Sequence, residues 1–306
     1  MTTAVELAAK RIKTLEVQGA RNVAITAIKA IEELTKKSRA QNKPQFMKEL
    51  FKARDVLFSS RETEPLMRNA VRHIIYEVEK SKEKNPKELA NLVHQVSSRF
   101  LQNLETSKER IAEIGSKRIK FHSRILTHCH SSTVTYLFER AKKEGKQFEV
   151  ICTETRPLFQ GRITAQELID LGIKTTMIVD SAVRFFMNKV DLVMVGADAI
   201  TSEGNVVNKI GTSLVALAAN EARTPFYVVS ELLKFDPSTV YGEYEKIEER
   251  NPKEIWADAP SNIEIRNPAF DITRRKFIHG IICEEGIISP HSVLEVVRKK
   301  YPWIFI

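Results

Sequence analysis

The chain has 306 residues, enough to bury a full core and to form two domains, and its 42% hydrophobic and 28% charged residues are ordinary for a soluble globular protein. The 48 basic and 39 acidic residues leave a net charge of +9, but they interleave, and the sequence lacks the basic tail, zinc-finger spacing or aromatic–basic strand that would indicate nucleic-acid binding. No apolar run reaches membrane-spanning length and no secretory pattern opens the chain, so we expect a cytoplasmic protein. The net charge predicts a solvated, mildly basic surface, whose field can also steer a small phosphorylated substrate.

The first third of the sequence predicts helices. Apolar residues recur at helical spacing in segments that are separated by prolines. These segments cover residues 5–15, 23–34, 46–57, 71–78 and 87–114. We therefore predict a helical N-terminal domain over residues 1–115, whose last helix leads into the second domain.

From about residue 120, apolar runs of strand type alternate with helical segments. The predicted strands are residues 124–127, 148–152, 176–179, 192–195, 226–229 and 280–283, and helical patterns lie between them at 164–171, 181–187 and 212–222. Continuous apolar strands that alternate with helices are typical of a parallel sheet covered on both faces. We therefore predict an α/β fold in which residues 116–306 form a doubly wound, Rossmann-like domain with a mainly parallel sheet.

Cys129 is the most informative single residue, because it stands between a predicted strand and a predicted helix. The partial positive charge of the helix N-terminus and the flanking His128 and His130 would stabilise a thiolate there. Cys152 and Cys283 lie in apolar runs and are expected to be buried, inert thiols. The two histidines have no third ligand at suitable spacing, so no metal site is predicted.

Polar residues follow several other predicted strands, at 154–157, 180–181, 196–198 and 230–231, and a further group at 208–212 opens a helix. Because the carboxyl ends of parallel strands meet at one edge, these residues should surround one pocket. Arg156, Lys209 and the helix start at Gly211 can hold phosphate oxygens, while Cys129 and Asp198 are a plausible pair for proton transfer. The sequence has neither a GxGxxG motif after the first strand nor a Walker motif, which disfavours dinucleotide and nucleoside-triphosphate enzymes, and no cofactor is expected.

Six short motifs occur in an order that resembles one known family. They are THCHS at 127–131, TETRP at 153–157, VGAD at 195–198, VNKIGT at 207–212, PFYV at 225–228 and NPAFD at 267–271. The chain resembles, over nearly its whole length, the family that joins sugar-1-phosphate isomerases to the alpha, beta and delta subunits of translation initiation factor 2B. Archaeal ribose-1,5-bisphosphate isomerases form the branch that it resembles most.

This resemblance implies a reaction and a set of site residues. In those isomerases a Cys and an Asp occupy the positions matched here by Cys129 and Asp198. Cys129 would remove the proton at carbon 2 of ribose 1,5-bisphosphate, Asp198 would assist ring opening, and the product would be ribulose 1,5-bisphosphate in the salvage of nucleotides such as AMP. The residues implied to hold the phosphates and hydroxyls are Gly19, Ala20, Arg21, Arg61, Asn208, Lys209 and Lys234.

Two other functions within the family stay open. Gln18 stands where the isomerases carry a phosphate-binding Arg, which resembles the initiation-factor branch, and Arg21 is the candidate replacement. A subunit of that branch would bind sugar phosphate or nucleotide, and initiation factor 2, without turnover. Methylthioribose-1-phosphate isomerases share the Cys–Asp pair but act on a substrate with one phosphate. The resemblance also implies a homodimer or homohexamer, with AMP as a candidate activator.

Overall fold

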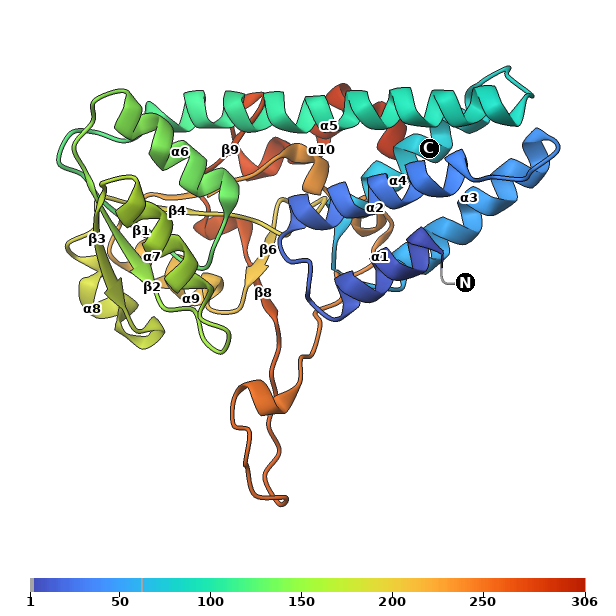
Figure 1. Cartoon of the computed structure of the whole chain (residues 1–306). Helices are drawn as coiled ribbons and strands as arrows, with labels where there is room; N and C mark the ends of the chain where they lie inside the picture. The colour runs from blue at the N-terminus through green and yellow to red at the C-terminus, as the bar shows by residue number, and fades with distance from the viewer. Residues whose placement is uncertain (1–2, 62, 306) are drawn as a thin grey trace.

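The computed structural model describes residues 3–61 and 63–305, which form a helical part and a sheet part joined by one long helix (Figure 1). The helical part confirms the predicted all-helical N-terminal region. Proline occupies the first turn of three of its helices, where the missing N–H costs no hydrogen bond. Its helices are α1 (Ala4–Lys13), α2 (Ala20–Lys36), α3 (Lys43–Phe58), α4 (Pro65–Lys80) and α5 (Pro86–Ser116).

The sheet part confirms the predicted doubly wound architecture. Seven strands lie in the order β10-β9-β7-β4-β1-β2-β3, and all neighbouring pairs are parallel except β9 with β10. The strands are β1 (Arg124–Thr127), β2 (Glu149–Thr153), β3 (Lys174–Ile178), β4 (Leu192–Val195), β7 (Phe226–Val229), β9 (Gly280–Cys283) and β10 (Gly286–Ile288). The helices of this part are α6 (Ser132–Lys143), α7 (Gln160–Asp170), α8 (Val183–Met187), α9 (Thr212–Glu221) and α10 (Val293–Lys300).

Both faces of the sheet are buried, which explains why its central strands are continuous apolar runs. Residues of α6, α7 and the C-terminal half of α5 pack on one face, against side chains such as Ile125 and Val150. Residues of α8 and α9 pack on the other face, against side chains such as Leu126 and Val193. Alternate residues of β1 therefore point into two separate cores.

The order of the strands reverses at β1. From β1 the chain moves outward through β2 to β3, and it then returns to β4 on the other side of β1. The loops after β1 and β4 consequently leave the sheet in opposite directions. In open α/β sheets this reversal opens a crevice at the carboxyl ends of the two strands.

A second, smaller sheet was not expected from the sequence. It consists of the antiparallel strands β5 (Ala199–Ile200), β6 (Val206–Lys209) and β8 (Phe270–Thr273). The segment of residues 242–269, which precedes β8, includes a long arm that projects from the body, drawn in orange (Figure 1). The strands of the small sheet are short and mix apolar with polar residues, as in Val206–Lys209 and Phe270–Thr273, and the arm has almost no regular structure, so no continuous apolar run reveals them.

Helix α5 belongs to both parts of the molecule. Its 31 residues bury Leu89, Val93 and Phe100 in the core shared with the other N-terminal helices, and Ile111 and Ala112 under the sheet. The domain division predicted at residue 115 therefore falls within the last turn of a helix that contacts both sides. Despite this length, no helix among residues 3–61 and 63–305 is apolar enough to cross a membrane.

Gly161 allows α7 to start directly against the end of β2. A Cβ atom at this position would lie 1.7 Å from the carbonyl oxygen of Thr153. Gly161→Ala should therefore force α7 away from the strand and lower the free energy of unfolding by about 1–3 kcal/mol, as overpacking typically does. Urea denaturation would measure this, with Gln166→Ala on the exposed face of the same helix as the control. Equal stability of the two variants would contradict the prediction.

Candidate active site

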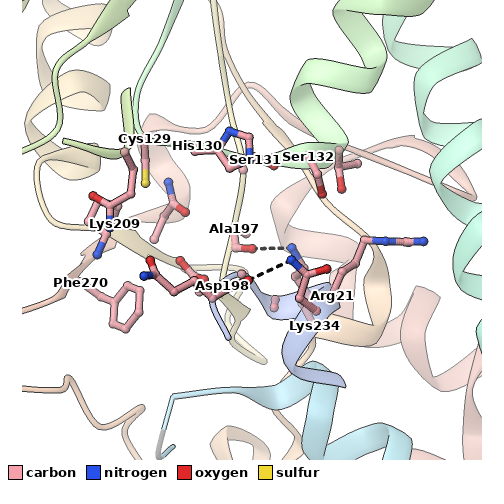
Figure 2. A pocket seen from close by; sticks show the side chains of 18 of the residues that line it. Arg21, Cys129, His130, Ser131, Ser132, Ala197, Asp198, Lys209, Lys234 and Phe270 are labelled. Carbon is pink, nitrogen blue, oxygen red and sulfur yellow. Dashed lines mark hydrogen bonds between the residues drawn. The ribbon is translucent and has the colours of Figure 1, made fainter. Parts of the chain in front are cut away.

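A cavity lies where the strand order reverses, between the N-terminal helices and the carboxyl ends of the strands. Most of the site residues predicted from the sequence line it, and the structure does not bring Arg156 to it. The predicted residues in its wall are Gly19, Ala20, Arg21, Arg61, Cys129, Asp198, Asn208, Lys209 and Lys234. Figure 2 shows the Cys129 sulfur and the Lys209 side chain directed into the same space, near Asp198 and Phe270.

The loop between β1 and α6 holds Cys129 in an unusual backbone conformation. Its φ of 68° is left-handed, which costs a non-glycine residue free energy and is common at functional sites. Two threonines fix its peptide groups: the Cys129 N–H donates to Thr155 Oγ1 at 3.0 Å, and Thr164 Oγ1 donates to the Cys129 carbonyl at 3.0 Å. Ser131 caps the N-terminus of α6 two residues further on. Cys129 thus stands where the sequence predicted it, between a strand end and a helix start.

The prediction that the surroundings of Cys129 stabilise its thiolate was wrong. Burial raises the pKa of the thiol to about 11, and the nearby carboxylate of Asp198 also raises it. Lys209 lowers the pKa, but by less than burial raises it. The sequence shows which charges are neighbours but not how much water the fold removes from the sulfur, and desolvation is the larger effect here.

This raised pKa predicts a pH dependence for alkylation of Cys129. The thiolate is the reactive form, so below the pKa its population, and with it the rate of reaction with iodoacetamide, should rise about tenfold per pH unit. For a pKa of about 11 the rise should continue from pH 7 to at least pH 10. Peptide-resolved mass spectrometry would measure it, with circular dichroism to check that the fold persists. A plateau below pH 9 would contradict the prediction.

Asp198 follows β4 at the other side of the reversal. Its backbone N–H donates to the carbonyl of Val207 at 2.9 Å, which ties the loop to the small sheet. The preceding residue, Ala197, accepts a hydrogen bond of 2.7 Å from the buried ammonium of Lys234, drawn as a dashed line in Figure 2. Asp198 therefore has a fixed backbone and a partly exposed carboxylate that faces the cavity.

The cations of the cavity differ in how they are neutralised. Arg61 lies 3.4 Å from Glu64 and 3.6 Å from Glu248, and it comes from the N-terminal helical part. Lys209, at the end of β6, lies 5.0 Å from the centre of the Phe270 ring. Within the described part of the chain no carboxylate oxygen lies within 4.0 Å of the Lys209 ammonium, so its charge is available to a bound anion.

Arg250 is a cavity residue that the sequence did not reveal. It lies on the arm, and its guanidinium is held by two hydrogen bonds of 2.9 Å to Glu254. Asn267 donates to the same carboxylate at 3.2 Å, and so orients the pair. The surrounding segment is charged and has no strand or helix pattern, so nothing in the sequence distinguishes Arg250 from a surface arginine.

Two helix N-termini contribute their free N–H groups to the cavity. Helix α2 begins after Gly19, whose φ of 82° suits glycine, and no side chain caps this end. Helix α6 begins at Ser132; the Ser131 hydroxyl accepts a hydrogen bond from the Val134 N–H at 3.4 Å, and Ser131 to Thr133 line the cavity. Such ends attract anions because their N–H groups are unpaired and the helix dipole is positive there. The cavity therefore offers two separate places for negatively charged groups.

Two of the predicted phosphate contacts are not available. Arg156 is exposed, its Nη2 donates to the carbonyl of Ile255 at 3.3 Å, and its guanidinium lies over the Phe159 ring. The helix start at Gly211 is already occupied, because Asp271 accepts hydrogen bonds from the Gly211 N–H at 2.8 Å and from the Ser213 hydroxyl at 2.8 Å. A carboxylate of the chain itself caps α9, which leaves no vacancy for a phosphate there.

Arg21 is also engaged by the protein. It is 8% exposed, and its Nη1 donates to the carbonyl of Leu104 at 2.8 Å and to Glu231 at 3.4 Å. Its Nη2 pairs with Glu105. Figure 2 shows the side chain directed away from Cys129. Arg21 borders the cavity, but its guanidinium does not replace the charge that is lacking at Gln18.

The histidines beside Cys129 have structural contacts. His128 is buried, with Nδ1 2.6 Å from Thr153 Oγ1 and Nε2 donating to the carbonyl of Ile210 at 2.8 Å. Burial lowers its pKa, so the ring is neutral. His130 Nδ1 lies 3.2 Å from Thr164 Oγ1. Across residues 3–61 and 63–305, no cluster of three His, Cys, Asp or Glu residues is placed to hold a metal ion.

Comparison with known proteins identifies the family. The model of the initiation factor 2 subunit family matches residues 16–290, which include every residue of the cavity except Leu15. The chain belongs to this family. It is 42% identical to the ribose 1,5-bisphosphate isomerase of Methanocaldococcus jannaschii over 297 residues, covering 96% of this chain and 94% of the relative. It is 39% identical to the enzyme of the same name from Thermococcus kodakarensis, with the same coverage.

Solved structures give the same picture of the fold. The translation initiation factor eIF-2B of Pyrococcus horikoshii superposes with a TM-score of 0.82 at 31% identity, covering 94% of this chain and 97% of the other. The 5-methylthioribose 1-phosphate isomerase of the same organism superposes with a TM-score of 0.78 at 28% identity, covering 97% and 87%. One backbone thus serves both the initiation-factor and the isomerase branches, so the fold alone does not assign the activity.

Proposed function

We propose that this protein is an aldose–ketose isomerase that converts ribose 1,5-bisphosphate to ribulose 1,5-bisphosphate. The observation that carries the proposal is the position of Cys129 and Asp198, which follow adjacent strands at the reversal of the sheet and border one cavity. A thiol and a carboxylate in one cavity can exchange protons with neighbouring carbons and oxygens of a sugar. The identity to two archaeal enzymes of this name supports the substrate.

The charges of the cavity suit two phosphate groups. The N-termini of α2 and α6 border it, as do Arg61, Lys209 and Arg250. A dianionic phosphate at each helix start would be stabilised by the unpaired N–H groups and by these cations. Methylthioribose 1-phosphate has one phosphate group and would leave one of the two helix starts without an anion. The two sites therefore favour the bisphosphate as the substrate.

In the proposed mechanism the Cys129 thiol and the Asp198 carboxylate share one proton. At rest the proton stays on the sulfur, because burial disfavours the thiolate. The reactive form is the arrangement with thiolate and carboxylic acid, which the positive charge of Lys209 favours, since it lowers the thiol pKa. The pair needs no change in its total number of protons to become active.

From that form each proton has a donor and an acceptor. Asp198 protonates the ring oxygen as the bond from carbon 1 to that oxygen breaks, and Cys129 takes the proton from carbon 2, which gives an enol phosphate. Asp198 then removes the proton of the hydroxyl on carbon 2, and Cys129 returns its proton to carbon 1. The products are the ketone at carbon 2 and the original thiolate and carboxylic acid, so the atoms balance without a cofactor.

The test is turnover of α-D-ribose 1,5-bisphosphate by the purified protein, with ribulose 1,5-bisphosphate detected as the product. Methylthioribose 1-phosphate should be turned over much more slowly, and AMP, the proposed activator, would be added in a parallel assay. Absence of turnover of either sugar, with and without AMP, would overturn the proposal. It would favour instead a non-catalytic subunit that binds sugar phosphate and initiation factor 2, for which Gln18 would be the sequence signal.

A further inference from the structure

Glu231 is a fully buried carboxylate behind the wall of the cavity, and the proposed mechanism does not use it. It follows β7 and is 0% exposed. Its Oε1 accepts hydrogen bonds from Arg21 at 3.4 Å and from the Thr133 hydroxyl at 3.2 Å, and its Oε2 lies 3.5 Å from the ammonium of Lys234. One side chain therefore contacts three different elements that border the cavity.

The three partners of Glu231 lie at the ends of their helices that border the cavity. Arg21 is in the first turn of α2, two residues after Gly19, and Thr133 is in the first turn of α6. Lys234 ends the short 3-10 helix Leu232–Lys234 and donates to the carbonyl that precedes Asp198. Burial opposes ionisation of Glu231, but Lys234, Arg21 and the hydrogen bonds to the carboxylate together outweigh it and lower the pKa, so the group is an anion between two cations.

A second contact fixes the same segment from the helical part. The side-chain amide of Asn69, in α4, donates to the carbonyls of Leu233 and Phe235, both at 2.8 Å. Asn69 is fully buried, so these bonds have no competition from water. Residues 231–235 are thus held by α2 and α4 on one side, and they hold Lys234 against the Asp198 loop on the other.

We propose that Glu231 is a positioning residue that holds the N-termini of α2 and α6 and, through Lys234, the loop before Asp198 in the arrangement that binds the phosphate groups. The inference rests on the proposed function for its substrate but not for its geometry. Glu231 acts through its partners and does not touch the sugar. Loss of its charge would leave Lys234 without its carboxylate partner and Arg21 with only Leu104 and Glu105, which loosens the start of α2. This weakens binding of the phosphate groups more than it slows the proton transfers.

The test is Glu231→Gln, which keeps the shape and removes the charge. We expect KM for ribose 1,5-bisphosphate to rise about tenfold while kcat changes by less than about threefold, since the lost interactions orient the binding groups. A residue with only a structural role would lower the melting temperature and the active fraction, hence kcat, and leave KM unchanged. Glu231→Asp keeps the charge on a shorter side chain, so its KM should lie between those of the wild type and Glu231→Gln. This variant replaces Glu231→Gln in the test if the Gln variant does not fold. The control is Glu221→Gln, which breaks an exposed ion pair with Arg184 on the outer surface.

A binding measurement separates this inference from the proposed function. The dissociation constant of inorganic phosphate, measured by calorimetry, should rise about tenfold in Glu231→Gln and stay at the wild-type value in Glu221→Gln. This holds whether or not the protein turns over ribose 1,5-bisphosphate. Equal phosphate affinity of the wild type and Glu231→Gln, or no phosphate binding by the wild type, would overturn the positioning role. Failure of turnover with intact, Glu231-dependent phosphate binding would overturn the isomerase assignment alone.

Discussion

Cys129→Ser is expected to lower kcat for ribose 1,5-bisphosphate by about 10³-fold or more, and Asp198→Asn to do the same. Proton transfer by a positioned group contributes typically about 10²–10⁴-fold, and the proposed mechanism uses each group twice. A serine hydroxyl cannot hold the negative charge that the thiolate holds, and an asparagine amide cannot donate and recover a proton. Both side chains border the cavity without supporting a core, so the fold should persist.

The measurement that checks this is steady-state turnover, combined with binding of the substrate to each variant. Cys152→Ser is the matched control, because Cys152 is buried in β2 and lies outside the cavity wall. The variants should bind substrate within a few-fold of the wild type while turnover is lost. Retention of more than a tenth of the wild-type kcat by either variant would exclude that residue from the proton-transfer pair.

Lys209→Met should lower kcat/KM by about 100-fold, through both of its components. Among the described residues, no carboxylate pairs with the Lys209 ammonium, so its charge can contact the substrate. Loss of this charge-assisted contact should cost about 1.5–3 kcal/mol. Lys209 also lowers the pKa of Cys129, so its removal should raise that pKa further and reduce the thiolate population. KM should therefore rise and kcat should fall.

Two readouts distinguish these effects. Steady-state kinetics separate KM from kcat, and the rate of Cys129 alkylation at fixed pH reports the thiolate directly; it should fall in Lys209→Met. Lys174→Met is the control, since Lys174 forms an exposed ion pair with Glu149 at the edge of the sheet. An unchanged alkylation rate would show that Lys209 acts on the substrate alone.

The sequence was sufficient for the architecture because burial on both faces leaves a strong pattern. The apolar runs at 124–127, 192–195, 226–229 and 280–283 coincide with β1, β4, β7 and β9. Cys129 and Asp198 could be placed at one edge because carboxyl ends of parallel strands share that edge. The order of the strands, which makes these two ends neighbours, has no local signature and became known only from the structure.

The wrong predictions for individual site residues share one cause. Residues distant in the sequence contact these groups or bury them. Arg156 turns toward Ile255 of the arm, and the start of α9 binds Asp271, some 60 residues further on. Arg250 borders the cavity because its segment pairs with Asn267 and Pro268, directly before β8. The raised pKa of Cys129 likewise depends on how tightly distant elements close over the sulfur. Residue types and spacing indicate which groups can react, but the availability of each group depends on these tertiary contacts.

The continuity of α5 also limits how the cavity can admit a sugar bisphosphate. Its 31 residues span about 46 Å at 1.5 Å per residue, and its buried side chains belong to both cores. Because α5 packs along its whole length, a large rotation of the helical part away from the sheet would disrupt the packing of both hydrophobic cores. We therefore expect substrate entry and product release to depend on short local movements of the loop before α2 and of the arm that carries Arg250, with the two large parts remaining one rigid frame.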